Sequence, residues 1–163
     1  MPTPKIGECP APLHQLSGAF VTIREENELR GCIGYIEGIK PLVEAVQEVA
    51  AKAAIDDPRF LPVSEEELGV IEIELSVISP LKHIKTVDEI EVGKHGLLIE
   101  LRNYRGLLLP QVATEHKWDR ETFLNQTARK AGLSSYAWKD PDVKISIFTA
   151  EIFGERPTTP AGR

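Results

Sequence analysis

An alternation of apolar and polar positions is the first regular feature of the chain, and it covers residues 19–24. Such a period of two is typical of a β-strand that is buried on one face or partly on both. The polar segment 25–28 interrupts the alternation, and a second extended stretch follows over residues 29–37. The two stretches together predict a β-hairpin.

Two longer segments have apolar positions at helical spacing. The first helix is predicted to begin at Pro41, because a proline fits the first helical turn, and to end before Pro58, because the residue before a proline disfavours helical backbone angles. The second helix begins with Asp119 as its cap and ends at Gly132, which can adopt the left-handed conformation of a helix terminus.

The remaining elements indicate the fold class. Ser64 and Glu67 have the spacing of a capping box at a short turn. Further strands are predicted over residues 71–77, 96–101, 107–109 and 143–153. Strands and helices therefore do not alternate as they do in a doubly wound fold. We expect an α+β fold with a mostly antiparallel or mixed sheet and two main helices packed on it.

The length of 163 residues fits one ordinary domain. Four prolines within the first twelve residues predict an extended N-terminal arm over residues 1–16. Residues 17–155 are expected to form the domain, and residues 156–163, with two further prolines, a C-terminal tail. Whether the domain divides into a large and a small lobe stays open at this point.

Composition and charge narrow the classes of partner and cofactor. The formal net charge is −6, which argues against a protein that binds duplex nucleic acid through its phosphates. No apolar segment has the length of a membrane span or the character of a signal peptide. The two cysteines cannot form a four-thiolate zinc site, and no phosphate-binding glycine loop is present. We expect a cytoplasmic protein without a cofactor, a metal or a membrane contact.

The most informative stretch for chemistry is the segment LRGCIG at residues 29–34. In an extended strand, Arg30, Cys32 and Gly34 would share one face. A guanidinium beside a thiol favours the nucleophilic thiolate, and a glycine lets a ligand or another backbone come close. The alternative is that Cys32 is a small buried apolar residue, as single cysteines in strands often are.

Two further residues are candidates for the same site. His95 is the candidate base for a cysteine nucleophile, because it lies in the polar loop GKHG before a predicted strand. A solvated loop histidine is the alternative. Arg59, in the segment DDPRF at residues 56–60, either pairs with the neighbouring acids or lines the same cleft as Arg30 and binds an anionic ligand.

Five segments in the same order resemble the AMMECR-one domain family. They are LRGCIG at 29–34, AAIDDPRF at 53–60, GKHGL at 93–97, GLLLPQVA at 106–113 and KAGL at 130–133. The resemblance extends from about Ser17 to Glu155 and implies an α+β fold with two unequal lobes and a cleft near the first segment. The chain departs from the family at Thr127, where members often have a cysteine, and this argues against a mechanism with paired thiols.

The resemblance also implies site residues and partners. Arg30, Gly31, Cys32 and Gly34 match the signature of the family and would form its site, while Arg59 has a weaker match. Fusions and gene neighbours within the family imply MEMO-type and radical-SAM proteins as partners.

Two functional hypotheses follow, and a third is purely structural. In the first, the site binds a partner protein, a peptide, a nucleotide or a small anion without chemistry. In the second, Cys32 is a nucleophile or covalent acceptor, Arg30 activates it and His95 is the acid or base. In the third, Gly31 and Gly34 serve only close packing. We favour the binding or regulatory module, because enzymatic turnover needs more groups than the sequence supplies.

Overall fold

A computed structural model describes residues 3–155 of the protein. The chain forms two compact units. The first unit comprises residues 1–80 and 151–163, and the second comprises residues 81–150. The units are unequal in size, as the family resemblance implied, and the predicted tail over residues 156–163 lies outside the described residues.

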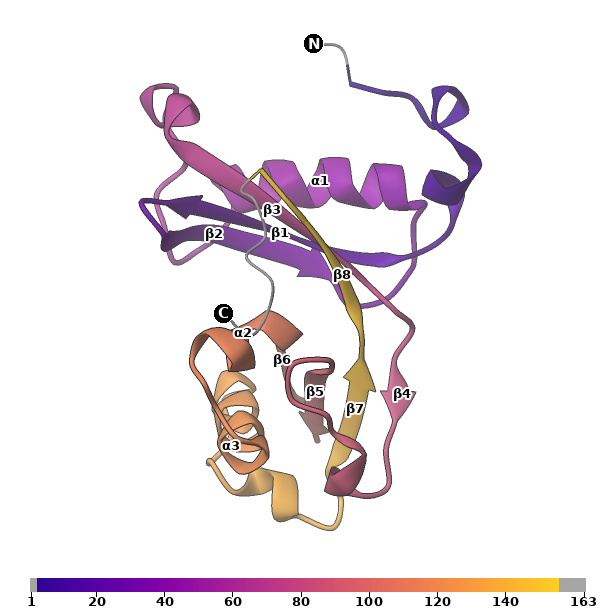
Figure 1. Ribbon diagram of the computed structural model, residues 1–163, viewed down its shortest axis with the longest axis vertical. Helices are drawn as coiled ribbons and strands as arrows, with labels where there is room; N and C mark the ends of the chain where they lie inside the picture. Colours follow the sequence, from indigo (N-terminus) through magenta and orange to yellow (C-terminus); the bar gives the residue numbers. More distant parts are fainter. Residues whose placement is uncertain (1–2, 156–163) are drawn as a thin grey trace. The chain divides into compact units, whose positions relative to one another are not determined.

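The first unit contains a four-stranded sheet with one long helix. Its main elements are β1 (Gly18–Glu25), β2 (Glu28–Tyr35), α1 (Leu42–Ile55), β3 (Ile71–Ile78) and β8 (Ala150–Gly154). The strands lie in the order β2-β1-β3-β8, and β1 pairs antiparallel with both β2 and β3. Helix α1 runs along one face of this sheet (Figure 1). Strand β2, which carries the LRGCIG segment, is therefore an edge strand.

Apolar residues on one face of β1 pack against α1. Val21 and Ile23 of β1 form the core of the unit together with Val49 and Ala53 of α1. The helix begins directly after Pro41, the residue from which its start was predicted. The hairpin of β1 and β2 is also confirmed.

Short turns complete the first unit. The predicted capping box is confirmed, because Ser64 N–H donates to Glu67 at 2.7 Å and Glu67 N–H donates to the Ser64 hydroxyl at 3.4 Å. The N-terminal arm contains two 3-10 turns where extended backbone was expected. The 3-10 turns of this unit are η1 (Ile6–Glu8), η2 (Ala11–His14) and η3 (Glu66–Gly69).

The second unit contains the other four-stranded sheet and two helices. Its elements are β4 (Lys82–His83), η4 (Val87–Glu89), β5 (Gly96–Leu101), β6 (Tyr104–Leu108), α2 (Pro110–Glu115), α3 (Arg120–Lys130), η5 (Ala137–Lys139) and β7 (Lys144–Phe148). The strand order is β4-β7-β5-β6, with antiparallel neighbours. Phe123 and Leu124 of α3 lie in one core with Leu97 and Ile99 of β5.

Helix α3 begins and ends where the sequence predicts. Asp119 Oδ1 accepts the N–H of Thr122 at 2.8 Å, and Gly132 has a φ of 81° just beyond the last turn. Helix α2 was not predicted, because Pro110 was expected only to end a strand, whereas it occupies the first turn of this short helix. None of the helices within residues 3–155 combines the length and apolar character of a membrane span.

Two sheets replace the single sheet that the sequence led us to expect. The segment 143–153 was predicted as one strand, but it divides at Thr149 into β7 and β8, which belong to different sheets. Alternation along a strand reports which of its faces are buried and not which strands lie beside it. The division could therefore not be predicted from that segment.

Candidate functional site

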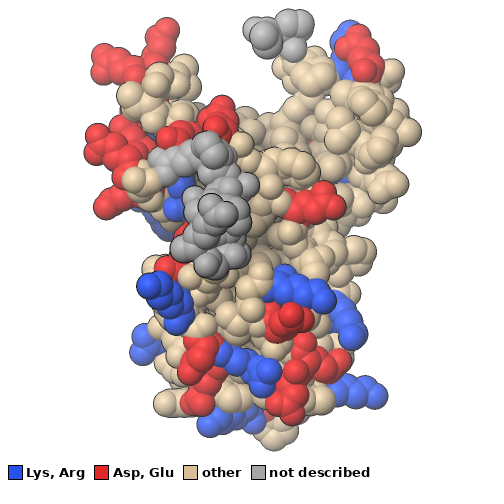
Figure 2. Space-filling model, in the orientation of Figure 1, with Lys and Arg blue, Asp and Glu red and all other residues tan. Residues whose placement is uncertain are grey.

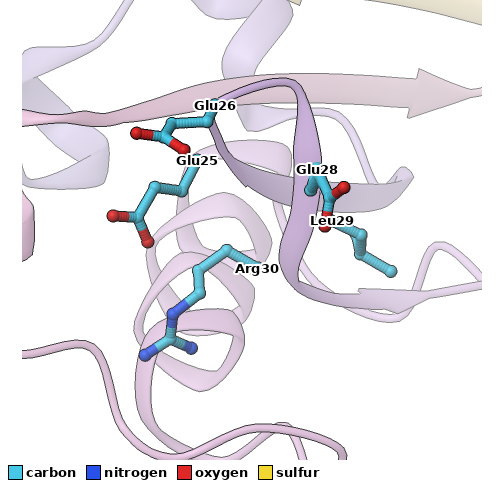
Figure 3. Close-up of a pocket in the computed structure, with 5 residues that line it drawn as sticks. All are labelled: Glu25, Glu26, Glu28, Leu29 and Arg30. Carbon is cyan, nitrogen blue, oxygen red and sulfur yellow. The ribbon is translucent and has the colours of Figure 1, made fainter.

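A β-bulge in β2 breaks the strict alternation of side chains in the LRGCIG segment. Cys32 lies opposite Thr22 of β1, whereas Arg24, two residues further along β1, lies opposite Leu29. Arg30 is therefore the extra residue of the bulge, and Leu29 takes its place on the face of Cys32. Figure 3 shows the side chains of Leu29 and Arg30 extending in different directions from β2. The prediction that Arg30 and Cys32 share one strand face is wrong for this reason.

The Arg30 guanidinium is held by Glu67 of η3. Its Nε donates to Oε1 of Glu67 at 2.7 Å and its Nη2 donates to Oε2 at 3.2 Å and to the Pro62 carbonyl at 3.4 Å. The bond to Arg30 is the main cause that holds the pKa of Glu67 at about 2. The Glu67 carboxylate, which accepts the N–H of Ser64 in the capping box, therefore also holds Arg30 in place.

Cys32 is partly buried, and its backbone is bound by the loop that follows α1. Its Sγ lies 3.4 Å from Oγ1 of Thr22, a buried residue of β1. Its N–H donates to Oδ2 of Asp57 at 2.9 Å, and its carbonyl accepts from Nη2 of Arg59 at 3.4 Å. The loop thereby occupies the two backbone groups that an edge strand would otherwise present to solvent at this position.

Asp57 and Arg59 form a bidentate ion pair in this loop. Oδ2 of Asp57 accepts from Nη2 of Arg59 at 2.7 Å, and Oδ1 accepts from Nε at 3.0 Å. The Asp57 side chain is 2% exposed and that of Arg59 is 43% exposed. The Arg59 guanidinium, and to a smaller degree the N–H of Cys32, holds the pKa of Asp57 well below its usual range. The pairing that the sequence predicted for this turn is confirmed for Asp57.

Both arginines lie over the ring of Phe60. The Cζ atom of Arg59 is 5.4 Å from the ring centroid, and that of Arg30 is 5.9 Å from it. Each guanidinium uses Nε and Nη2 for its protein acceptors, and Nη1 takes part in none of the hydrogen bonds found within residues 3–155. Fixed guanidinium groups with an open edge are suited to bind a carboxylate or a phosphate.

Arg59, whose Nη2 lies 3.4 Å from the carbonyl oxygen of Cys32, is the arginine that contacts this residue. The pKa of Arg59 is raised mainly by its bond to Asp57, with a smaller contribution from the charge of Cys32. The causes that raise the pKa of Arg30 are its bond to Glu67 and the charges of Glu67 and Glu25. That an arginine activates the Cys32 thiol stays a prediction.

Close packing explains both glycines of the LRGCIG segment. A Cβ atom on Gly31 would lie 2.3 Å from the carbonyl oxygen of Ala53 in α1. A Cβ atom on Gly34 would lie 2.3 Å from the ring of Phe20 in β1. These contacts support the structural hypothesis for the two glycines, because helix and ring occupy the space that a side chain would need.

His95 belongs to the second unit, in the loop before β5, whereas the other predicted site residues belong to the first. Its Nδ1 accepts the N–H of Glu91 at 3.0 Å, so the neutral ring carries its proton on Nε2. Burial, and after it the charge of Lys94, lowers the pKa of His95. A neutral ring in this state donates through Nε2.

An open hollow of about 280 Å³ lies at the tip of the β1–β2 hairpin. It is lined by Glu25, Glu26, Glu28, Leu29 and Arg30 (Figure 3). In Figure 2, acidic side chains gather over this hairpin and η3. Within residues 3–155, no group of three or more His, Cys, Asp or Glu side chains is placed to hold a metal ion.

Thr22 and Phe60, which lie beside Cys32 and the two arginines, were not among the predicted site residues. Thr22 has the pattern of an ordinary strand residue, and only the pairing of β1 with β2 places it beside Cys32. Phe60 follows Arg59 directly in the sequence. An aromatic residue next to an arginine is a signal that could have identified it.

Comparisons with known proteins extend over both units. The sequence matches the profile of the AMMECR1 family over residues 2–153. Protein TK0174 of Thermococcus kodakarensis is 48% identical over 167 residues, which covers 96% of this chain and 82% of that protein. Protein PF1979 of Pyrococcus furiosus is 46% identical, with 96% of this chain and 80% of that protein covered.

A solved structure has the same fold. The crystal structure of protein PH0010 from Pyrococcus horikoshii matches with a TM-score of 0.90 at 44% sequence identity. The match covers 96% of this chain and 81% of that chain. The α+β architecture predicted from the sequence is thereby confirmed.

Proposed function

Taking as our premise that the chain belongs to the AMMECR1 family, we propose that it is a binding or regulatory module. Its binding site is the arginine site, defined as Arg30, Cys32, Asp57, Arg59 and Phe60. The observation that carries the proposal is the state of Arg59, whose side chain is 43% exposed and is fixed by Asp57 along one edge. The other edge, at Nη1, is left for a ligand.

The ligand that suits this site is an acidic group of a partner protein or a small anion. A guanidinium that is already held in place loses little conformational freedom when it binds an oxyanion. Arg30, with a side chain that is 16% exposed, adds a second positive charge over the Phe60 ring. Gly31 and Gly34 contribute by letting α1 and Phe20 pack closely around β2.

The partners we propose are MEMO-type and radical-SAM proteins, and the proposed location is the cytoplasm. The family resemblance supports these partners. The net charge of −6 supports a protein or small anion over duplex nucleic acid as the ligand. A partner would place an aspartate, a glutamate or a terminal carboxylate against Nη1 of Arg59.

Calorimetric titration tests the proposal. The purified chain is titrated with a purified MEMO-type protein and with a purified radical-SAM protein from the same source organism. We expect Arg59→Ala to weaken binding about tenfold or more, because a charged hydrogen bond contributes roughly 1.5–3 kcal/mol. Lys130→Ala, which removes one exposed charge from the second unit, is the matched control and should keep the affinity. Equal affinities of the two variants, or no binding by either partner, would contradict the proposal.

A cysteine-dependent enzyme, or an enzyme component, is the second candidate, and the contact between Arg59 and Cys32 supports it. Cys32 would be the nucleophile, with Arg59 bound to its backbone carbonyl. The test is the rate at which iodoacetamide alkylates Cys32 in a Cys9→Ser background. We expect Arg59→Gln to slow alkylation about tenfold and Arg30→Gln to leave the rate unchanged. A rate equal to that of a free thiol in all three proteins would eliminate this candidate.

A further inference from the structure

A cluster of four side chains outside the arginine site joins the end of β2 to α1. The Tyr35 hydroxyl donates to Oε1 of Glu48, and Nζ of Lys40 donates to Oε2 of the same carboxylate. Nζ of Lys52 lies 2.9 Å from Oε1 of Glu48 and 3.0 Å from the Tyr35 oxygen. The ammonium groups of Lys40 and Lys52 are 5.7 and 5.4 Å from the centroid of the Tyr35 ring.

This cluster has an excess of positive charge. Each arginine of the arginine site has a carboxylate of its own, whereas Lys40 and Lys52 share the carboxylate of Glu48. Hydrogen bonds from Lys40, Tyr35 and Lys52 hold the pKa of Glu48 at about 2, so Glu48 is ionised at neutral pH. The group therefore carries two positive charges against one negative charge. The first unit as a whole has 8 Lys and Arg residues and 16 Asp and Glu residues. Most of its surface therefore repels an anion.

The two ammonium groups are accessible and have donors left. The side chains of Lys40 and Lys52 are 39% and 40% exposed. An ammonium has three N–H donors. The bonds described above use one donor of Lys40 and two of Lys52, which leaves two donors on the first and one on the second.

We propose that Tyr35, Lys40 and Lys52 form a binding site for a phosphate group. The remaining donors belong to two ammonium groups, and a phosphate offers each of them its own oxygen, which a single small halide does not. Lysine binds phosphate as a point charge, and contact with the Tyr35 ring limits the positions of both ammonium groups before the ligand arrives. The one positive charge in excess attracts a phosphate anion. The phosphate is either the free ion or the terminal group of a monoester.

Nuclear magnetic resonance of the lysine side chains tests this site on the full chain. Protein labelled at lysine is titrated with inorganic phosphate and, separately, with O-phosphoserine, at constant ionic strength set with sodium chloride. We expect saturable shifts at Lys40 and Lys52. Lys40→Gln should weaken binding about fivefold and Glu48→Gln should strengthen it about fivefold, because the two changes alter the charge in opposite senses. Lys85→Gln, an exposed lysine of the second unit, is the control and should keep the affinity of the unaltered protein.

The outcomes separate the two sources of phosphate and can overturn the site. Tighter binding of O-phosphoserine assigns the site to a monoester, and tighter binding of inorganic phosphate assigns it to the free ion. Amide spectra establish whether each variant is folded. If Glu48→Gln is not folded, Lys40→Gln alone decides the test, because Lys40 precedes α1. Shifts that do not saturate, or equal affinities in Lys40→Gln and Lys85→Gln, would overturn the proposal.

Discussion

The backbone N–H of Cys32 donates to the buried carboxylate of Asp57 at 2.9 Å, across 25 positions of sequence. This bond joins the edge strand β2 to the loop after α1. Because the same carboxylate holds both Nε and Nη2 of Arg59, the position of the thiol and the position of the guanidinium depend on one acid. Asp57 therefore organises the arginine site although it has almost no exposed surface of its own.

Replacing Asp57 by asparagine should destabilise the protein. The change removes the charge that balances Arg59 and offers the loop one acceptor oxygen where there were two. We expect Asp57→Asn to lower the free energy of unfolding by about 2–3 kcal/mol, measured by urea denaturation. Asp56→Asn alters the exposed neighbouring acid and should change it by less than about 0.5 kcal/mol. Similar losses in the two variants would show that Asp57 does not have this role.

Stability should fall when the pH drops below about 4. The folded-state pKa values of Glu67 and Glu48 are lowered to about 2, whereas an unfolded glutamate titrates at about 4.3. A carboxylate with a lowered pKa contributes stability above its unfolded pKa and loses that contribution as the pH falls through its folded pKa. The window for the two glutamates is therefore about pH 4 to 2, and that of Asp57, whose pKa is also lowered, extends further into acid.

Urea denaturation at a series of pH values between 7 and 2 measures this loss. Glu67→Gln should make the decline between pH 4 and 2 shallower, because one carboxylate with a lowered pKa is removed. Glu66→Gln, at the neighbouring position of η3, should leave the decline as steep as in the unaltered protein. An unchanged decline in Glu67→Gln would refute the proposed contribution of the Arg30–Glu67 pair.

The fold could be predicted from the sequence where one face of an element is buried and its end is marked by a particular residue. This holds for α3, whose cap Asp119 and terminator Gly132 are both local signals. It does not hold at Thr149, where the chain leaves one sheet and enters the other. That choice depends on strands far away in the sequence, and a local pattern carries no information about them.

The candidate site shows the same limit. Arg30, Cys32 and Arg59 could be selected as residues because arginine and cysteine are chemically distinctive in a strand or a turn. Their geometry could not be derived, because the bulge at Arg30 exists only in the pairing of β2 with β1. Glu67 lies 37 positions from Arg30 in the sequence, and no rule of residue spacing predicts the ion pair between them.

The turn between β1 and β2 offers a stabilising substitution. Glu26 and Asn27 have φ angles of 49° and 71°, in the left-handed region that glycine adopts more readily than a residue with a side chain. We expect Asn27→Gly to raise the free energy of unfolding by roughly 0.5 kcal/mol. Thermal denaturation followed by circular dichroism measures it, with Asn103→Gly in the second unit as a comparison, because Asn103 is not among the residues with positive φ. A greater gain from Asn103→Gly would contradict the turn geometry.

The substitution Gly31→Ala, which adds a single methyl group, tests whether Gly31 serves packing or binding. The added Cβ would lie 2.3 Å from the carbonyl oxygen of Ala53, a backbone atom that no side-chain rotation can move away. The last turn of α1 must therefore shift from β2, and we expect Gly31→Ala to lower the free energy of unfolding by about 2 kcal/mol.

Gly69→Ala is the matched control for this substitution, because a Cβ atom on Gly69 meets nothing within 4 Å. It should change the free energy of unfolding by less than about 0.5 kcal/mol. Stability alone does not separate the two roles, so the calorimetric affinity for the partner protein is measured on the same samples. A loss of stability without a loss of affinity assigns Gly31 to the packing of α1. A loss of affinity in a protein as stable as the Gly69→Ala control would instead place Gly31 in the binding surface.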